Sequence, residues 1–196
     1  MTAATPVARA RSARAFDYTA VAGAAVGCGA LAARPALLAV AARPAVMLGV
    51  LFAGLLVFAV AIPLPRDDAP ARQTTTSAAL VTALGVTAFA AGRLAVGGHA
   101  PTKVTLGVVL ANTLAAVAEE AWFRRLCFGL LAPAGPVFAV AGSTLLFAAV
   151  HVSIYGFWIL PLDLAAGALL GWQRAVTGSW AAPAVTHVIA NLLVLL

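Results

Sequence analysis

Apolar residues occur along this chain in long runs that are separated by short polar segments and by clusters of proline and glycine. Each run approaches the roughly 20 residues that a helix needs to cross the hydrocarbon core of a bilayer. The runs cover residues 16–33, 44–64, 78–96, 104–131, 137–152, 157–176 and 180–196. This pattern predicts an all-α fold, a polytopic integral membrane helical bundle with about seven transmembrane helices.

The composition supports the same class of protein. Of the 196 residues, 63% are hydrophobic and 9% are charged, whereas a soluble domain carries about 25% charged residues. So few charges cannot cover a water-soluble surface, and lipid must therefore face much of the chain. We expect the lipid bilayer to be a partner and little of the sequence to form a soluble module.

The net charge of +6 does not indicate a nucleic-acid partner. The twelve Lys and Arg residues are scattered in short segments between apolar runs, as topology signals are, and form no basic stripe with interleaved aromatics. Arginines in 1–14 and 66–72 favour a cytoplasmic N-terminus, although a re-entrant first or fifth run would alter the topology. Cys28 and Cys127 lack CxxC spacing, so we interpret them as small buried hydrophobes.

Two adjacent glutamates, Glu119 and Glu120, lie inside the long apolar run 104–131. A carboxylate at membrane depth is unfavourable, so such a residue indicates a functional site. Glu120 and Arg124 are four residues apart, share a helix face and can form an ion pair. Glu119 is rotated by about 100° and is left for another partner. We therefore expect one glutamate to be structural and the other to be available for chemistry.

Two further polar pairs follow at helical spacing, Phe147 with His151 and His187 with Asn191. Glu119 and His151 together could hold and deprotonate a water molecule. An imidazole and an amide on one face, as His187 and Asn191 provide, could stabilise a developing oxyanion. The alternative is a structural network of hydrogen bonds between helices. The spacing alone leaves Asp163 open, either as the partner of an arginine or as a residue facing a polar cavity.

Three motifs in this order, Glu119-Glu120-x-x-x-Arg124, Phe147-x-x-x-His151 and His187-x-x-x-Asn191, resemble the signature of the CPBP family of intramembrane proteases. This family is also called the CAAX protease or bacteriocin-processing (ABI) family. The segment 177–180 before the last motif is similar as well. The resemblance covers residues 104–196, which we expect to form a CPBP-like intramembrane protease domain. Residues 1–103 are expected to supply transmembrane helices of unclear role.

The resemblance implies motif helices around a polar cavity. Glu119 would activate water together with His151, while His187 and Asn191 would form the oxyanion site. Glu120 and Arg124 would support that geometry. Phe147, whose ring we expect to pack, is the supporting residue of its motif. For these motifs to meet at one depth, the fifth helix must be longer than the run 137–152 or be tilted.

The resemblance leaves the role of metal open, because the family has been described both as metalloproteases and as glutamic proteases. Glu119, His151 and His187 could bind zinc, although no HExxH spacing is present. The same residues could equally act as a metal-free base and oxyanion site. We assign no cofactor and favour the metal-free mechanism.

The leading hypothesis is an intramembrane endopeptidase that hydrolyses a peptide bond in a membrane-associated protein or peptide, in a plasma membrane of bacterial type. One alternative is a non-proteolytic immunity or scaffold protein of the same fold. Another is a small proton-coupled transporter that uses Glu119 and the two histidines as a proton relay. The complete motif set favours the enzyme over the scaffold. The lack of inverted internal repeats argues against the transporter.

Overall fold

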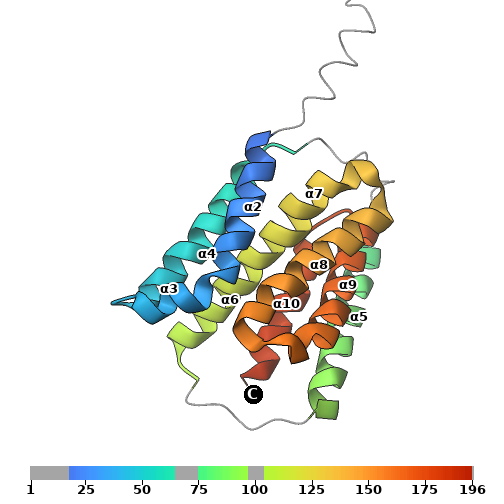
Figure 1. Cartoon of the computed structure of the whole chain (residues 1–196). Coiled ribbons are helices and arrows are strands. Elements are labelled where there is room, and N and C mark those ends of the chain that lie inside the picture. The colour runs from blue at the N-terminus through green and yellow to red at the C-terminus, as the bar shows by residue number, and fades with distance from the viewer. Residues whose placement is uncertain (1–17, 65–74, 97–103, 196) are drawn as a thin grey trace, which may run out of the picture.

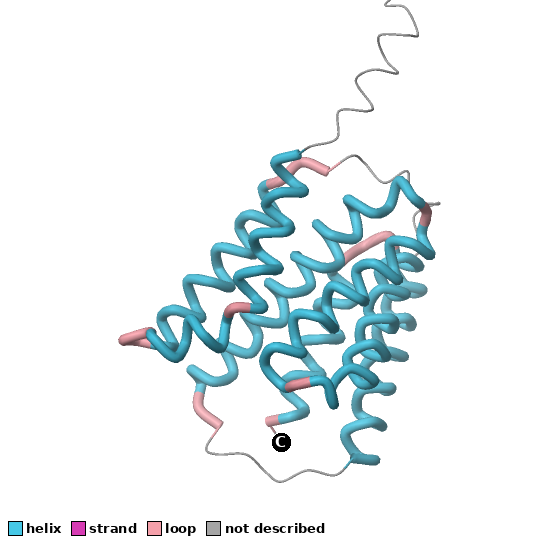
Figure 2. Tube along the Cα trace, in the orientation of Figure 1, coloured by secondary structure: helices cyan, strands magenta, loops and turns pink. Residues whose placement is uncertain are grey.

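The computed structural model describes residues 18–64, 75–96 and 104–195, and in these ranges the chain is helical and contains no strand (Figure 2). In chain order the helical elements are α2 (Tyr18–Ala32), α3 (Arg34–Val40), α4 (Pro44–Ala61), α5 (Thr75–Val96), α6 (Leu106–Glu120), η1 (Ala121–Cys127), α7 (Phe128–Leu131), η2 (Ala132–Ala134), α8 (Pro136–Tyr155), η3 (Phe157–Ile159), α9 (Leu160–Thr177) and α10 (Ala181–Val194). The expected all-α helical bundle is confirmed. The arginines used for the topology prediction, in 1–14 and 66–72, lie outside the described residues.

The glutamate-bearing helix α6 lies between two groups of helices (Figure 1). On one side are α2, α3 and α4, drawn blue to teal, with α4 packed on α6 and on η1. On the other side α9 packs against both α8 and α10, α10 contacts α6, and α5 packs against α9 and α10. The middle of the chain thus lies between the N-terminal and the C-terminal helices of the bundle.

The number of spans was expected to be about seven. Within the described residues, four helical stretches are long and apolar enough to cross a membrane, and a fifth results if α2 and α3, which are bent by 58°, form one broken span. Helix α10 is apolar but shorter than a full span. A count of seven is therefore not confirmed, because the apolar runs do not all become straight helices of full length. These long apolar helices nevertheless indicate an integral membrane protein.

Proline and glycine set the helix ends that position the site. Pro35 lies in the first turn of α3, where its missing N–H is tolerated, and it prevents α2 from continuing straight. Helix α8 continues to Tyr155 and ends at Gly156, whose φ of 83° favours glycine. This helix is therefore longer than the run 137–152, which brings His151 inside it, as convergence of the motifs requires.

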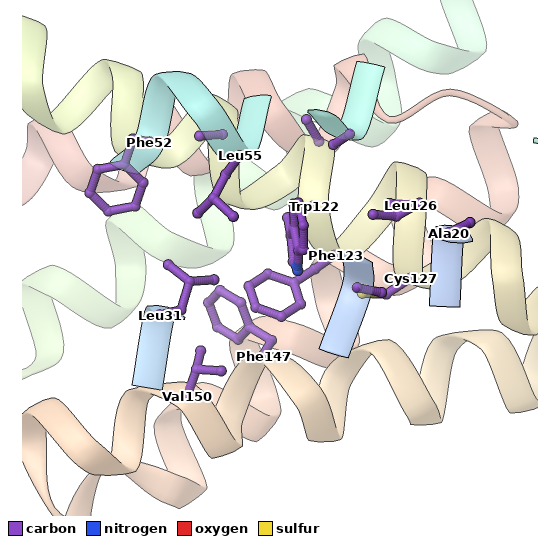
Figure 3. Packing of buried hydrophobic residues seen from close by; sticks show 14 residues of the cluster. Ala20, Leu31, Phe52, Leu55, Trp122, Phe123, Leu126, Cys127, Phe147 and Val150 are labelled. Atoms are coloured by element: carbon purple, nitrogen blue, oxygen red, sulfur yellow. The ribbon is translucent and has the colours of Figure 1, made fainter. Parts of the chain in front are cut away.

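The apolar core joins the two halves of the chain (Figure 3). Trp122 and Phe123, from η1, are almost fully buried, and Phe123 meets Phe147 of α8 edge to face at a centroid distance of 5.4 Å. Leu31 at the end of α2 and Phe52 of α4 complete this cluster from the N-terminal side. The segment carrying the motif arginine is thus held by packing from both halves.

Gly27 of α2 offers a test of this packing. A Cβ atom added at Gly27 would overlap the indole ring of Trp122, whereas one added at Gly29 would meet nothing within 4 Å. We expect Gly27→Ala to destabilise the protein by about 1–3 kcal/mol, because the buried ring has little room to move. Gly29→Ala is the matched control and should be neutral or slightly stabilising. Thermal unfolding in detergent measures both, and equal stability of the two variants would contradict this packing.

Candidate active site

The two glutamates lie at the point where α6 widens into the π-helical segment η1. Such π segments inside α-helices are rare and frequently occur at functional sites. Glu119 is 5% exposed and Glu120 is fully buried. Both carboxylates are therefore removed from water, and each needs a partner from the surrounding helices.

Glu120 is bound by one residue of its own helical segment and by one from α10. Its Oε1 atom lies 3.3 Å from Nη1 of Arg124, which confirms the predicted i,i+4 ion pair. The same oxygen lies 2.8 Å from Nδ1 of His187. Arg124 also donates from Nη2 to the backbone carbonyl of Gly167 at 3.2 Å. Glu120 therefore links α6, η1 and α10, as expected for a structural glutamate.

The hydrogen bonds of the two histidines define which ring nitrogen each presents to the site. Nδ1 of His151 lies 2.8 Å from the backbone carbonyl of Phe147, and a carbonyl can only accept, so this nitrogen carries the proton. Nδ1 of His187 likewise donates to the carboxylate of Glu120. In the neutral rings both Nε2 atoms are therefore unprotonated acceptors.

Glu119 faces these two nitrogens. Its Oε2 atom lies 3.9 Å from Nε2 of His151 and 3.9 Å from Nε2 of His187. Its other oxygen, Oε1, lies 3.5 Å from Nη1 of Arg34. The structure thus brings one residue of each of the three motifs together and leaves Glu119, rather than Glu120, facing both imidazoles.

The ring of Phe147 fills the space between the charged groups. Its centroid lies 4.5 Å from that of His151 and 6.0 Å from that of His187, and Cζ of Arg124 lies 4.5 Å from it. A cation over an aromatic face is attracted by the ring quadrupole. Phe147 therefore packs against side chains of all three motifs, and its supporting role stays a prediction.

Asn191 and Asp163 are less directly tied to this group. Asn191 follows His187 by one turn of α10, is half-buried, and has no hydrogen-bond partner among the described residues. Asp163, in the first turn of α9, is buried, and its Oδ2 atom has no partner in the same ranges. It interacts electrostatically with His151 and Glu119. An arginine partner for Asp163, one of the two alternatives, is not seen there.

Three arginines that lie between or at the ends of apolar runs make contacts inside the bundle. Arg34 contacts Glu119. Arg125 donates to the carbonyls of Ala59 and Ile62 at the end of α4, and Arg174 donates to the carbonyl of Arg124 at 3.0 Å. The available sequence signal was weak: an arginine beside a proline between two apolar runs, or at a helix end, equally fits a membrane boundary.

The arrangement around Glu119 is wider than a zinc site. Zinc bonds of about 2.0–2.2 Å in a tetrahedron place neighbouring donor atoms about 3.3 Å apart, whereas Oε2 of Glu119 lies 3.9 Å from each Nε2. In the described ranges, no three His, Cys, Asp or Glu side chains have the spacing of a metal site. The set Glu119, His151 and His187 does not fit zinc in this conformation.

An apolar helical bundle in which a glutamate faces two histidines has the side chains that hydrolysis within a membrane would need. Residues 101–193 match the model of a family described as type II CAAX prenyl endopeptidase Rce1-like. The matched residues make up just under half of the chain and are similar to that family, which confirms the resemblance based on the three motifs. No curated protein and no solved structure matches the chain.

Proposed function

We propose that this protein is an intramembrane endopeptidase that hydrolyses a peptide bond in a membrane-associated protein or peptide of CAAX type, in a plasma membrane of bacterial type. The observation that supports this most is the position of Glu119, with Oε2 3.9 Å from the Nε2 atoms of two histidines. A separation above 3.5 Å between polar atoms is commonly bridged by water. One water molecule spans 3.9 Å with hydrogen bonds of about 2.8 Å.

In the proposed reaction Glu119 removes a proton from that water while its oxygen attacks the carbonyl carbon of the scissile bond. His151 orients the water through Nε2. The carbonyl oxygen becomes an oxyanion, to which the side-chain amide of Asn191 can donate directly. When the C–N bond breaks, the proton held by Glu119 passes to the leaving amine. One water is consumed, and a carboxylic acid and an amine are formed.

The contacts of His187 refine its proposed role. Because its Nδ1 donates to Glu120, Nε2 can donate to an oxyanion only after it has itself taken up a proton. The carboxylate of Glu120 stabilises such an imidazolium, as a buried acid does in other histidine-dependent hydrolases. We therefore propose that His187 stabilises the oxyanion only when its ring is protonated. The amide of Asn191 can donate to the oxyanion whatever the protonation state of His187.

The proposal is tested with purified protein in liposomes and a farnesylated fluorogenic peptide that ends in a CAAX sequence. We expect one new peptide terminus, identified by mass spectrometry, at a rate proportional to enzyme. The same peptide without the lipid is the control for membrane association. Absence of cleavage by folded protein would contradict the proposed substrate class and would favour the scaffold or transporter alternatives.

Metal dependence distinguishes the metal-free mechanism proposed here from a zinc-dependent one. We expect chelators to leave cleavage unchanged and active protein to contain far less than stoichiometric zinc, because the proposed base and oxyanion donors need no metal. The measurements are elemental analysis and activity after chelation and zinc add-back. Stoichiometric zinc whose removal reversibly stops cleavage, and whose binding is lost in His151→Ala, would overturn the metal-free mechanism.

A further inference from the structure

Arg34 reaches the proposed site from the other half of the chain. It is 85 residues before Glu119 and lies outside the segment 101–193 that matches the family. Its Nη1 atom lies 3.5 Å from Oε1 of Glu119, and its Cζ lies 5.4 Å from the ring centroid of Phe52 on α4. The guanidinium is thus held between an aromatic ring and the carboxylate, and only 14% of the side chain is exposed.

The local fold explains why this arginine turns inward. Leu31, 1% exposed, anchors the last turn of α2 in the core. The chain then bends by 58°, and Arg34 is the first residue of α3, with Pro35 after it. An arginine that only marked a membrane boundary would be exposed, as Arg43 is. The bend therefore directs Arg34 toward α6 rather than out of the bundle.

Because of the contact with Arg34, the two carboxylate oxygens of Glu119 have different partners. Oε1 is held by Arg34, while Oε2 faces both histidines. A carboxylate without such a partner can rotate, and small misplacements of a reacting group reduce rate strongly. Each glutamate also has its own arginine, Arg124 for Glu120 and Arg34 for Glu119, so neither carboxylate is left uncompensated at membrane depth.

We infer that Arg34 is a positioning residue for the hydrolytic reaction, which orients Glu119 toward the histidines, and that the N-terminal half of the chain completes the active site. This inference rests on the proposed function. It assigns to α2 and α3 a role in the reaction itself, in addition to spanning the membrane.

The kinetic test compares Arg34→Ala and Arg34→Lys with the matched control Arg43→Ala, using the farnesylated peptide in liposomes. For Arg34→Ala we expect kcat to fall by about 10- to 100-fold with little change in KM, because substrate binding is unaffected and the base is misplaced. Arg34→Lys keeps the charge and should recover part of the rate, and Arg43→Ala should match the parent. A parent-like kcat in Arg34→Ala, or a change in KM alone, would overturn the inference.

A second measurement does not depend on catalysis. Thermal unfolding of Arg34→Ala, Glu119→Ala and the double variant forms a double-mutant cycle. We expect Arg34→Ala to lower the Tm less when Glu119 is already absent, whereas additive shifts would show that the two side chains do not interact. If the parent fails to cleave the peptide, the proposed function fails while this cycle still decides the contact. If Glu119→Gln is inactive but Arg34→Ala keeps the parent kcat, the function stands and the positioning role falls.

Discussion

Glu119→Gln should reduce peptide cleavage by about 10²–10⁴-fold, the usual effect of losing a general base. The amide matches the carboxylate in shape, and its oxygen can still accept from Arg34, but it cannot take a proton from water at neutral pH. Because the side-chain shape and the contact with Arg34 are retained, we expect the variant to insert into the membrane normally and to have a Tm close to that of the parent. The measurement is initial cleavage rate in liposomes, with folded protein quantified by gel filtration.

The matched control for this variant is Asn112→Ala, also on α6. The amide of Asn112 donates only to the carbonyl of Val108 in its own helix, at 2.9 Å, so its loss should leave cleavage unchanged. Near-full activity of Glu119→Gln would contradict the role proposed for Glu119. If both variants lost cleavage rate equally, the loss would reflect a general sensitivity of α6 to substitution and not the loss of a general base.

The part of the site that is local in sequence could be predicted from spacing. Residues four apart on a helix share a face, and this gave the pair of Glu120 with Arg124, and the packing of Phe147 on His151. The same argument left Glu119 facing other partners, which is what the structure shows. These inferences succeeded because helical geometry alone determines them.

Contacts between distant segments could not be predicted in this way. Nothing in the spacing indicates that His187 bonds Glu120 rather than Glu119, or that Arg34 reaches Glu119. Both follow from tertiary packing, from the bend after α2 and from the π-helical segment that changes the direction of side chains after Glu120. The count of seven spans is not confirmed for a related reason, because hydropathy records length but not bends or breaks.

Arginines that a sequence suggests to be at a membrane boundary can instead bind backbone groups inside the bundle. In the sequence Arg125 and Arg174 resemble boundary markers, yet both donate to backbone carbonyls of neighbouring segments. Backbone groups in a bilayer must be satisfied within the protein, and a guanidinium with five donors suits that task. The charge of these residues therefore contributes to holding the helices around the glutamates together.

Glu120→Ala should act differently from Glu119→Gln, because it should lower the yield of folded protein as well as activity. Removing one member of a buried ion pair leaves Arg124 uncompensated, at about 3–5 kcal/mol. It also removes the acceptor of Nδ1 of His187, so this ring loses its fixed orientation. We expect a lower Tm in detergent and reduced cleavage by the fraction that folds.

The double variant Glu120→Ala with Arg124→Ala distinguishes a true pair from two independent residues. With both charges removed, no uncompensated guanidinium remains, so the double variant should be more stable than Glu120→Ala alone. Recovery should be partial, because Arg124 also lies over the ring of Phe147 and donates to Gly167. Activity should not recover, since His187 still lacks its carboxylate. Losses that simply add would mean that the 3.3 Å contact between Glu120 and Arg124 contributes no coupling.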